Sequence, residues 1–147
     1  LNNLAMIYRA KGLTRQAATL YEASLMMATS LGDRATRLQI LQNLGNTYLT
    51  LREFAQAVDC YEQFLTLNEN GEGAVDNRTT RRVLTQLTLA SIARGDHNRA
   101  IVHLQHHLSI ACALGDTKGA ASLIDDLKRS YVALSEARVS VLRPELP

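Results

Sequence analysis

Apolar side chains in the middle of the chain recur at steps of three and four residues. A first stripe comprises Leu41, Leu44, Tyr48 and Leu51, and a second comprises Ala57, Tyr61, Phe64 and Leu65. Steps of this size place side chains on one face of an α-helix. The pattern therefore predicts two consecutive amphipathic helices, joined at a tight corner around residues 52–53.

The same two-helix pattern recurs along the whole chain. At an offset of 40 residues Tyr8 matches Tyr48 and Tyr21 matches Tyr61, and a third copy follows after a further 43 residues. A fourth, partial copy repeats the first stripe from Ile124 onward. We predict repeats over 1–33, 41–73 and 84–116, a single polar capping helix over 117–138 and an extended tail over 139–147. The polar stretch 68–80 is expected to be a long loop between the second and third copies.

Corner and cap residues recur in register with the helices. Gly12 and Gly95 stand where the first helix of a copy ends, and glycine adopts the left-handed conformation of a helix end at little cost. Asp33 and Asp116 each precede a predicted helix and can accept hydrogen bonds from its free backbone N–H groups. These signals predict antiparallel helix pairs.

One position of the first helix carries a small residue that lets two helices approach closely. It is Ala5 in the first copy and Gly45 in the second, but Thr88 in the third and Lys128 in the fourth. Each helix pair is too small to bury its own apolar face, so the copies are expected to stack and share one core.

The pattern resembles the tetratricopeptide repeat family. Over residues 1–138 the resemblance rests on the motifs Leu44-Gly45-x-x-Tyr48 and Ala57-x-x-x-Tyr61-x-x-Phe64 and their equivalents in the other copies. The repeat of about 40 residues is similar to the longer-unit subgroup that contains kinesin light chains and the spindle adaptors Pins and LGN. The implied fold is all-α, a right-handed superhelical solenoid of antiparallel helix pairs, and the implied function is protein–protein interaction.

In this family the first helix of each pair lines a concave groove that holds a partner peptide or helix. The expected groove residues lie beside the core stripe of each first helix: Asn2, Met6, Arg9, Gln39, Gln42, Asn43, Asn46, Leu49, Thr50, Arg82, Thr85, Leu89, Ile92, Asp125 and Arg129. Carboxamides can bond to a peptide backbone in both directions, and Arg can pair with a carboxylate. Asn46 matches the Asn of family members that clamp a C-terminal carboxylate, but their paired lysines have no match, which argues against a chaperone-tail clamp. Alternatively, the asparagines solvate or cap exposed helix faces.

Two other functions stay open at this point. The chain could be a regulatory or sensory domain of a larger signalling or transcriptional protein, and we expect a piece of a larger protein because a helical pattern is already under way at Leu1. It could also self-associate, since Leu1, Leu4 and Tyr8 would expose apolar surface at the open end of a repeat stack.

Composition and motifs exclude several function classes. A net charge of +2, from 16 basic and 14 acidic residues, gives no electrostatic case for nucleic acid. The apolar runs are too short to cross a membrane, and two cysteines without a secretion signal favour the cytoplasm. Asn70-Gly71-Glu72-Gly73 lacks the Lys-Ser/Thr of a phosphate loop, and no nucleophile motif is present, so neither an enzyme nor a cofactor is expected. His103, His106 and His107 lack a further ligand, so no metal site is expected.

Overall fold

The computed structural model describes residues 1–71 and 76–142, which form seven helices and no strand. The helices are α1 (Asn2–Ala10), α2 (Thr14–Ser30), α3 (Arg34–Thr50), α4 (Phe54–Glu69), α5 (Asn77–Ala93), α6 (His97–Ala113) and α7 (Thr117–Leu142). The predicted all-α class is confirmed.

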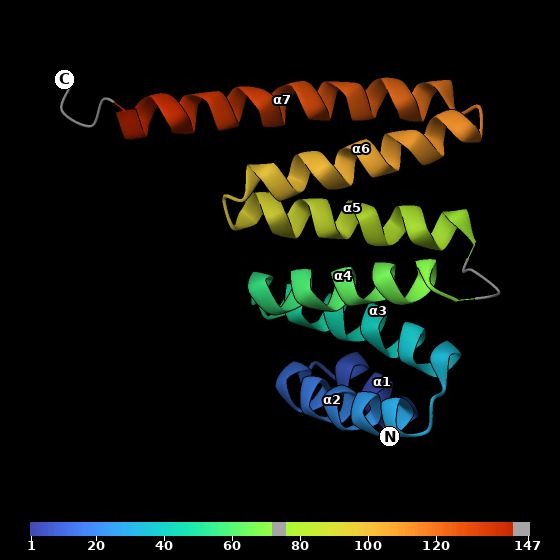
Figure 1. Ribbon diagram of the computed structural model, residues 1–147. Coiled ribbons are helices and arrows are strands. Elements are labelled where there is room, and N and C mark those ends of the chain that lie inside the picture. Colours follow the sequence, from blue (N-terminus) through green and yellow to red (C-terminus); the bar gives the residue numbers. More distant parts are fainter. Residues whose placement is uncertain (72–75, 143–147) are drawn as a thin grey trace.

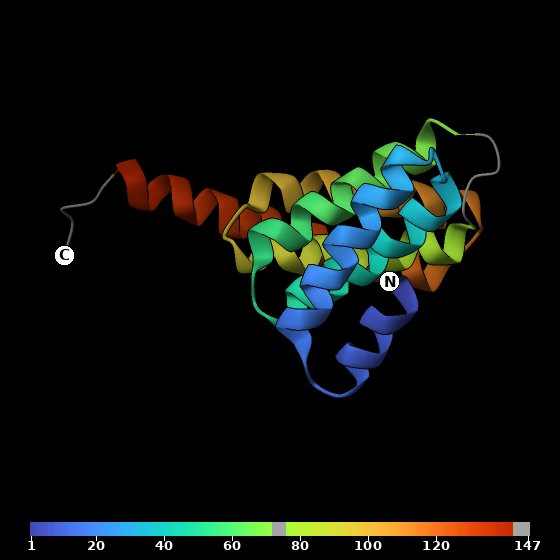
Figure 2. The same cartoon turned by 90° about the horizontal axis from the view of Figure 1, so that it is seen from below.

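The helices stack in chain order, each antiparallel to the one before it (Figure 1). Contacts join successive helices from α1 to α7, and α3 also reaches α5. The C-terminal part of α7 extends beyond the rest of the stack (Figure 2). Three helix pairs are thus followed by a single last helix.

The helix pairs begin earlier than the sequence comparison indicated. The predicted copy starts, Leu41 and Leu84, lie seven residues inside α3 and α5, which begin at Arg34 and Asn77. The first copy starts at Leu1, the equivalent of Leu41, so an alignment based on that copy could not include the first two turns of the longer helices.

The same backbone geometry recurs at the corners from α1 to α4 and at the corners from α5 to α7. The N–H three residues past the helix end bonds to a carbonyl five residues earlier, as in Leu13 to Tyr8 and Glu53 to Tyr48, both at 2.9 Å. This bond requires a left-handed residue at the corner. Gly12 and Gly95 take that conformation as predicted, with φ of +79° and +73°, whereas Arg52 adopts it without being glycine, at φ +59°.

Aspartates cap four of the helices. Asp33 accepts from the Thr36 N–H at 3.1 Å and Asp116 from the Gly119 N–H at 2.9 Å, as predicted. Asp76 and Asp96 cap α5 and α6 in the same way. The side chains of Thr36 and Arg81, together with the backbone N–H bonds, hold the pKa values of Asp33 and Asp116 below their usual range.

The core is built from the repeated positions. Gly45 of α3 lies against the ring of Tyr61 on α4 so closely that a Cβ on Gly45 would be 2.6 Å from Tyr61 Cε1. The same spacing pairs Ala5 with Tyr21 and Thr88 with Leu104, and all of these side chains are buried. A smaller residue on the first helix thus accompanies a larger one on the second.

Two predicted irregular segments are helical in part. In the predicted loop 68–80, Asn68 and Glu69 belong to α4. Residues 77–80 belong to α5, because Asp76 caps that helix. Residues 72–75 lie outside the described part. In the predicted tail, residues 139–142 continue α7, since the two prolines come only at positions 144 and 147. Residues 143–147 lie outside the described part.

Candidate partner-binding site

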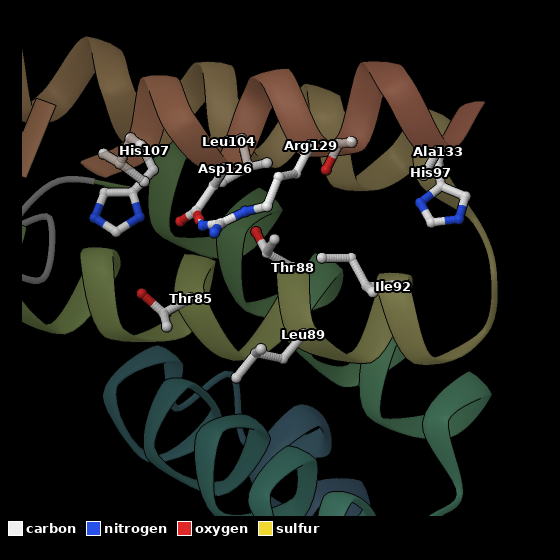
Figure 3. A pocket seen from close by; sticks show the side chains of 12 residues that line it. Thr85, Thr88, Leu89, Ile92, His97, Leu104, His107, Asp126, Arg129 and Ala133 are labelled. Atoms are coloured by element: carbon white, nitrogen blue, oxygen red, sulfur yellow. The ribbon is translucent and has the colours of Figure 1, made fainter. Parts of the chain in front are cut away.

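A cavity of about 350 Å³ lies between α5, α6 and α7 (Figure 3). Its lining residues are Thr85, Thr88, Leu89 and Ile92 from α5, His97, Leu104 and His107 from α6, and Leu123, Asp126, Arg129, Ser130 and Ala133 from α7. The first helix of the third pair and the single last helix therefore form its two walls, and α6 supplies the remaining side.

The cavity combines apolar surface with a few polar groups. Leu104 and Leu123 are buried in it, while Leu89 is 56% exposed and Ile92 is 41% exposed. Asp126 and Arg129 form an ion pair on α7 and point toward α5 (Figure 3). Such a site can enclose an apolar side chain and offer charge at its edge.

A second cavity, of about 390 Å³, adjoins the first and shares Thr85 and His107 with it. Its other lining residues are Arg78, Arg81, Arg82 and Leu114. The guanidinium groups of Arg78 and Arg82, beside the first, apolar cavity, make this end of the stack suited to a carboxylate.

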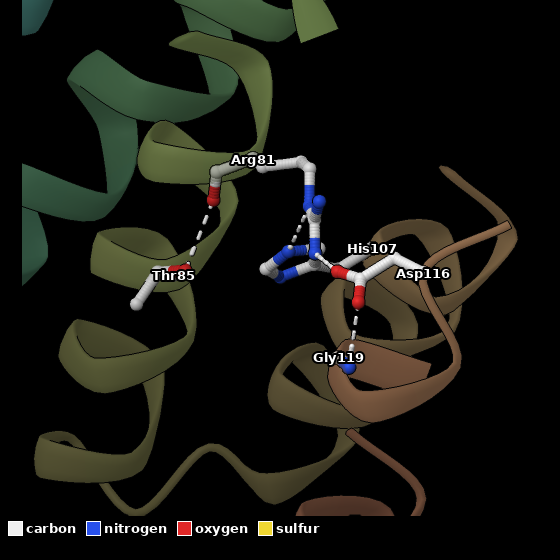
Figure 4. A network of polar contacts seen from close by, with 5 residues as sticks. All are labelled: Arg81, Thr85, His107, Asp116 and Gly119. Carbon is white, nitrogen blue, oxygen red and sulfur yellow. Dashed lines mark hydrogen bonds and ion pairs between the residues drawn. The ribbon is translucent and has the colours of Figure 1, made fainter. Parts of the chain in front are cut away.

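Arg81 links three elements around these cavities (Figure 4). Its Nε donates to His107 Nε2 at 3.1 Å, and a terminal nitrogen lies 2.7 Å from Asp116 Oδ2. Asp116 in turn caps α7 through Gly119. Arg81 therefore ties α5 to α6 and to the start of α7.

The network fixes the protonation state of His107. A nitrogen that accepts from Arg81 carries no proton, so His107 is neutral with its proton on Nδ1. Burial lowers the pKa of His107, and the Arg81 charge lowers it further.

A third cavity, of about 270 Å³, lies between α3 and α5. It is lined by Arg34, Ala35, Leu38, Gln39, Gln42, Phe64 and Thr79. Arg34 also donates to the carbonyls of Leu67 and Asn68 at the end of α4, which positions its guanidinium at the rim.

The three cavities bring together part of the predicted groove set. Those that line a cavity are Gln39, Gln42, Arg82, Thr85, Leu89, Ile92 and Arg129. Those that are not among the lining residues are Asn2, Met6, Arg9, Asn43, Asn46, Leu49, Thr50 and Asp125. On α7, Asp126 lines the first cavity and its neighbour Asp125 does not.

Asn46 has a partner inside its own helix pair. Its Oδ1 accepts from the Tyr61 hydroxyl at 2.5 Å, which uses one of the two acceptor positions of that oxygen. Nearby, Leu49 packs against the core and the Thr50 hydroxyl donates to the Asn46 carbonyl. Substitution of Asn46 would therefore disturb packing as well as any contact to a partner.

Sequence reasoning missed several residues of the first cavity, above all Thr88, His97, His107, Asp126 and Ser130. Helical spacing was the available signal, because steps of three and four from Thr85 and Arg129 reach Thr88, Asp126 and Ala133. The repeat pattern instead places Thr88 and His107 at packing positions between helices.

His103 and Cys60 have structural surroundings. His103 Nε2 lies 3.5 Å from Glu62 Oε1, and burial lowers its pKa although Glu62 opposes that effect. Burial raises the pKa of the Cys60 thiol to about 12.

Within residues 1–71 and 76–142, His, Cys, Asp and Glu form no group of three that could hold a metal ion. None of the described helices combines the length and apolar character needed to cross a membrane.

Comparisons with known proteins agree with this geometry. The tetratricopeptide repeat family model matches residues 1–70. The putative kinesin light chain of Podosopora anserina, with nearly identical TPR-like repeats, is similar with a TM-score of 0.74 and 19% identity, over 98% of this chain and 70% of that one. BtubC (BKLC) from P. vanneervenii is similar with a TM-score of 0.62 and 23% identity, over 90% of this chain and 62% of that one. No curated protein matches the sequence. The structural likeness confirms the superhelical repeat fold.

Proposed function

Since residues 1–70 belong to the tetratricopeptide repeat family and the helices beyond them continue the same fold, we propose that the chain holds a partner peptide in its groove. Repeats of this family are generally protein-interaction modules and generally not enzymes. The groove would run along the first helices α1, α3 and α5 and along α7. The proposal assigns no catalytic step to the chain. It also places the chain in the cytoplasm.

The observation that carries the proposal is the apolar cavity between α5, α6 and α7. Leu89 and Ile92 are large apolar side chains left half-exposed at its mouth, where a ligand side chain could cover them. Preformed apolar cavities with a few polar groups are the usual form of a ligand site. An exposed leucine alone would carry little weight, but here it adjoins a cavity.

The polar groups suggest how a peptide would be held. Gln39 and Gln42 offer carboxamides to its backbone beside the α3–α5 cavity. Arg82 and Arg129 offer guanidinium groups at the two adjoining cavities, where the partner's carboxylates would pair with them. Arg9, Met6 and the other predicted residues of α1 would extend the same groove.

Selection of binding peptides from a random library displayed on phage tests the proposal, because it requires no named partner. Peptides selected on the parent chain are synthesised, and their affinities are measured by calorimetry for the parent and for Leu89→Glu. We expect a loss of about 5- to 150-fold, because a carboxylate in the apolar cavity must be desolvated, at a cost of about 1–3 kcal/mol.

The matched control is Val102→Glu on α6, an equally exposed apolar residue that does not line the first cavity. Selected peptides should bind this variant as they bind the parent. Peptides that tolerate Leu89→Glu but lose affinity for Val102→Glu would place the binding surface elsewhere and contradict the proposal.

A further inference from the structure

The last helix keeps open a face that the equivalent helix α3 buries. In α3, Leu41 and Tyr48 are buried at 1% and 8% exposure in a tight pair with α4. Their equivalents in α7, Ile124 and Tyr131, are 42% and 49% exposed. α6 borders this face, where Gln105 Nε2 donates to the Tyr131 hydroxyl at 3.2 Å, but no described helix covers the face as α4 covers that of α3.

This face is not built for a helix of the α4 type. On α3 the close approach of α4 depends on Gly45, which leaves room for the Tyr61 ring. The equivalent position on α7 is Lys128, which is exposed. A charged side chain at the point of closest approach prevents the same packing, so the face needs a different occupant.

The exposed stripe of α7 is complementary to itself when read in the reverse direction. Its centre lies between Tyr131 and Val132, and at equal distances on either side apolar residues face apolar ones, Asp125 faces Arg138, and Lys128 faces the polar Ser135. In an antiparallel pair of α7 helices the facing residues would be Ile124 with Val139, Asp125 with Arg138, Lys128 with Ser135, and Tyr131 with Val132. All eight residues are exposed.

From this arrangement we infer that a second copy of the chain covers α7, with the two α7 helices packed antiparallel about Tyr131 and Val132. By symmetry each of these contacts occurs twice, so two carboxylates meet two guanidinium groups across the interface. The apolar pairs supply the buried area, and the Asp125–Arg138 pairs set direction and register. The apolar surface continues onto α6 through Val102, which is 59% exposed.

The paired stripe is distinct from the proposed groove. The residues of α7 that line the first cavity are Leu123, Asp126, Arg129, Ser130 and Ala133, and none of them belongs to the stripe. Self-association through α7 is therefore independent of peptide binding, and either can fail without the other.

Charge reversal tests the interface. Sedimentation equilibrium of the purified chain from about 1 to about 500 μM should show the mass of one chain rising toward that of two. Asp125→Arg and Arg138→Asp should each raise the dimer dissociation constant about tenfold or more, because both symmetric contacts become repulsive. An equimolar mixture of the two variants should dimerise like the parent, since only the mixed pair places opposite charges against each other.

The control is Asp59→Arg on α4, which makes the same charge change at another exposed helical position and should leave dimerisation unchanged. Circular dichroism confirms that each variant keeps its helices. Three results would each overturn the inference. The parent chain could stay monomeric, or the mixture could fail to restore dimers. The dimers could also persist in both charge-reversal variants but be lost in Leu4→Asp, at the other end of the stack.

Discussion

The closest contact in the core gives a prediction whose sign separates packing from helix propensity. Gly45 lies in the middle of α3, where alanine would stabilise an isolated helix by about 1 kcal/mol. In the folded chain, however, the new methyl group would be 2.6 Å from Tyr61 Cε1 and within 3.0 Å of two further ring atoms. Gly45→Ala therefore sets a gain in propensity against a steric clash.

The clash should prevail by a modest margin. Overpacking of a buried position costs about 1–3 kcal/mol. Tyr61 is fully buried and held through its hydroxyl by Asn46, so the ring cannot swing aside freely. We expect the free energy of unfolding to fall by about 1 kcal/mol, the difference between an overpacking cost of about 2 and the propensity gain.

Urea unfolding followed by far-UV circular dichroism measures the effect, with Thr66→Ala on the exposed face of α4 as the control for propensity alone. In a Tyr61→Leu background, which copies the Thr88–Leu104 pair of the third repeat, the alanine should become neutral or stabilising. If Gly45→Ala stabilises the parent chain by about 1 kcal/mol, the clash does not exist and the packing argument is wrong.

Three further predictions follow from the corners and the Arg81 network. Arg52→Gly should raise the free energy of unfolding by about 1 kcal/mol in the same urea assay, because the left-handed backbone there strains any side chain; a loss would show that the Arg52 side chain stabilises the corner. Because the pKa of His107 is lower in the folded chain, the unfolded chain binds protons first as pH falls below about 6.5, and the free energy of unfolding should decline from there. His107→Gln should flatten this decline. An unchanged dependence of the free energy of unfolding on pH would refute the role of His107. Asp116→Ala should lower the midpoint of thermal unfolding more than Asp96→Ala, since both cap a helix but Asp116 pairs with Arg81 across two repeats, whereas Asp96 pairs with Arg99 of the helix it caps. Equal shifts would mean that the pair across repeats contributes no more than the local one.

The parts of the fold that sequence predicts are those fixed by local rules. Periodic stripes, a glycine at a corner and an aspartate before a helix act within a few residues, so the helix pairs and the caps at Asp33 and Asp116 could be predicted. The early starts of α3 and α5 could not, because the first copy lacks the residues that would have aligned with them. Arg52 shows the limit of the glycine signal, since the surrounding stack imposes a corner on a residue that does not favour it.

The candidate site was less predictable because it depends on contacts between distant residues. Nothing local reveals that Asn46 is engaged by Tyr61, or that Arg81 reaches His107 and Asp116, which lie 26 and 35 residues away. The face of a helix could be assigned, as for Leu89 and Ile92, but not the neighbour that closes a cavity over it. Asp126 could not be preferred to Asp125 before the rotation of α7 on α6 was known.

The succession of contacts from each helix to the next has a kinetic consequence. Most interactions join residues close in sequence, so little loop entropy is lost before a contact forms, and folding should be fast for a chain of this length. The short α1 packs on α2, with Leu1 and Leu4 left half-exposed, whereas the largest fully buried side chains gather in α3, α4 and α5. Folding should therefore nucleate in these middle helices and spread outward, and amide hydrogens should exchange fastest at the first helix, in a gradient that a globule with one central core would lack.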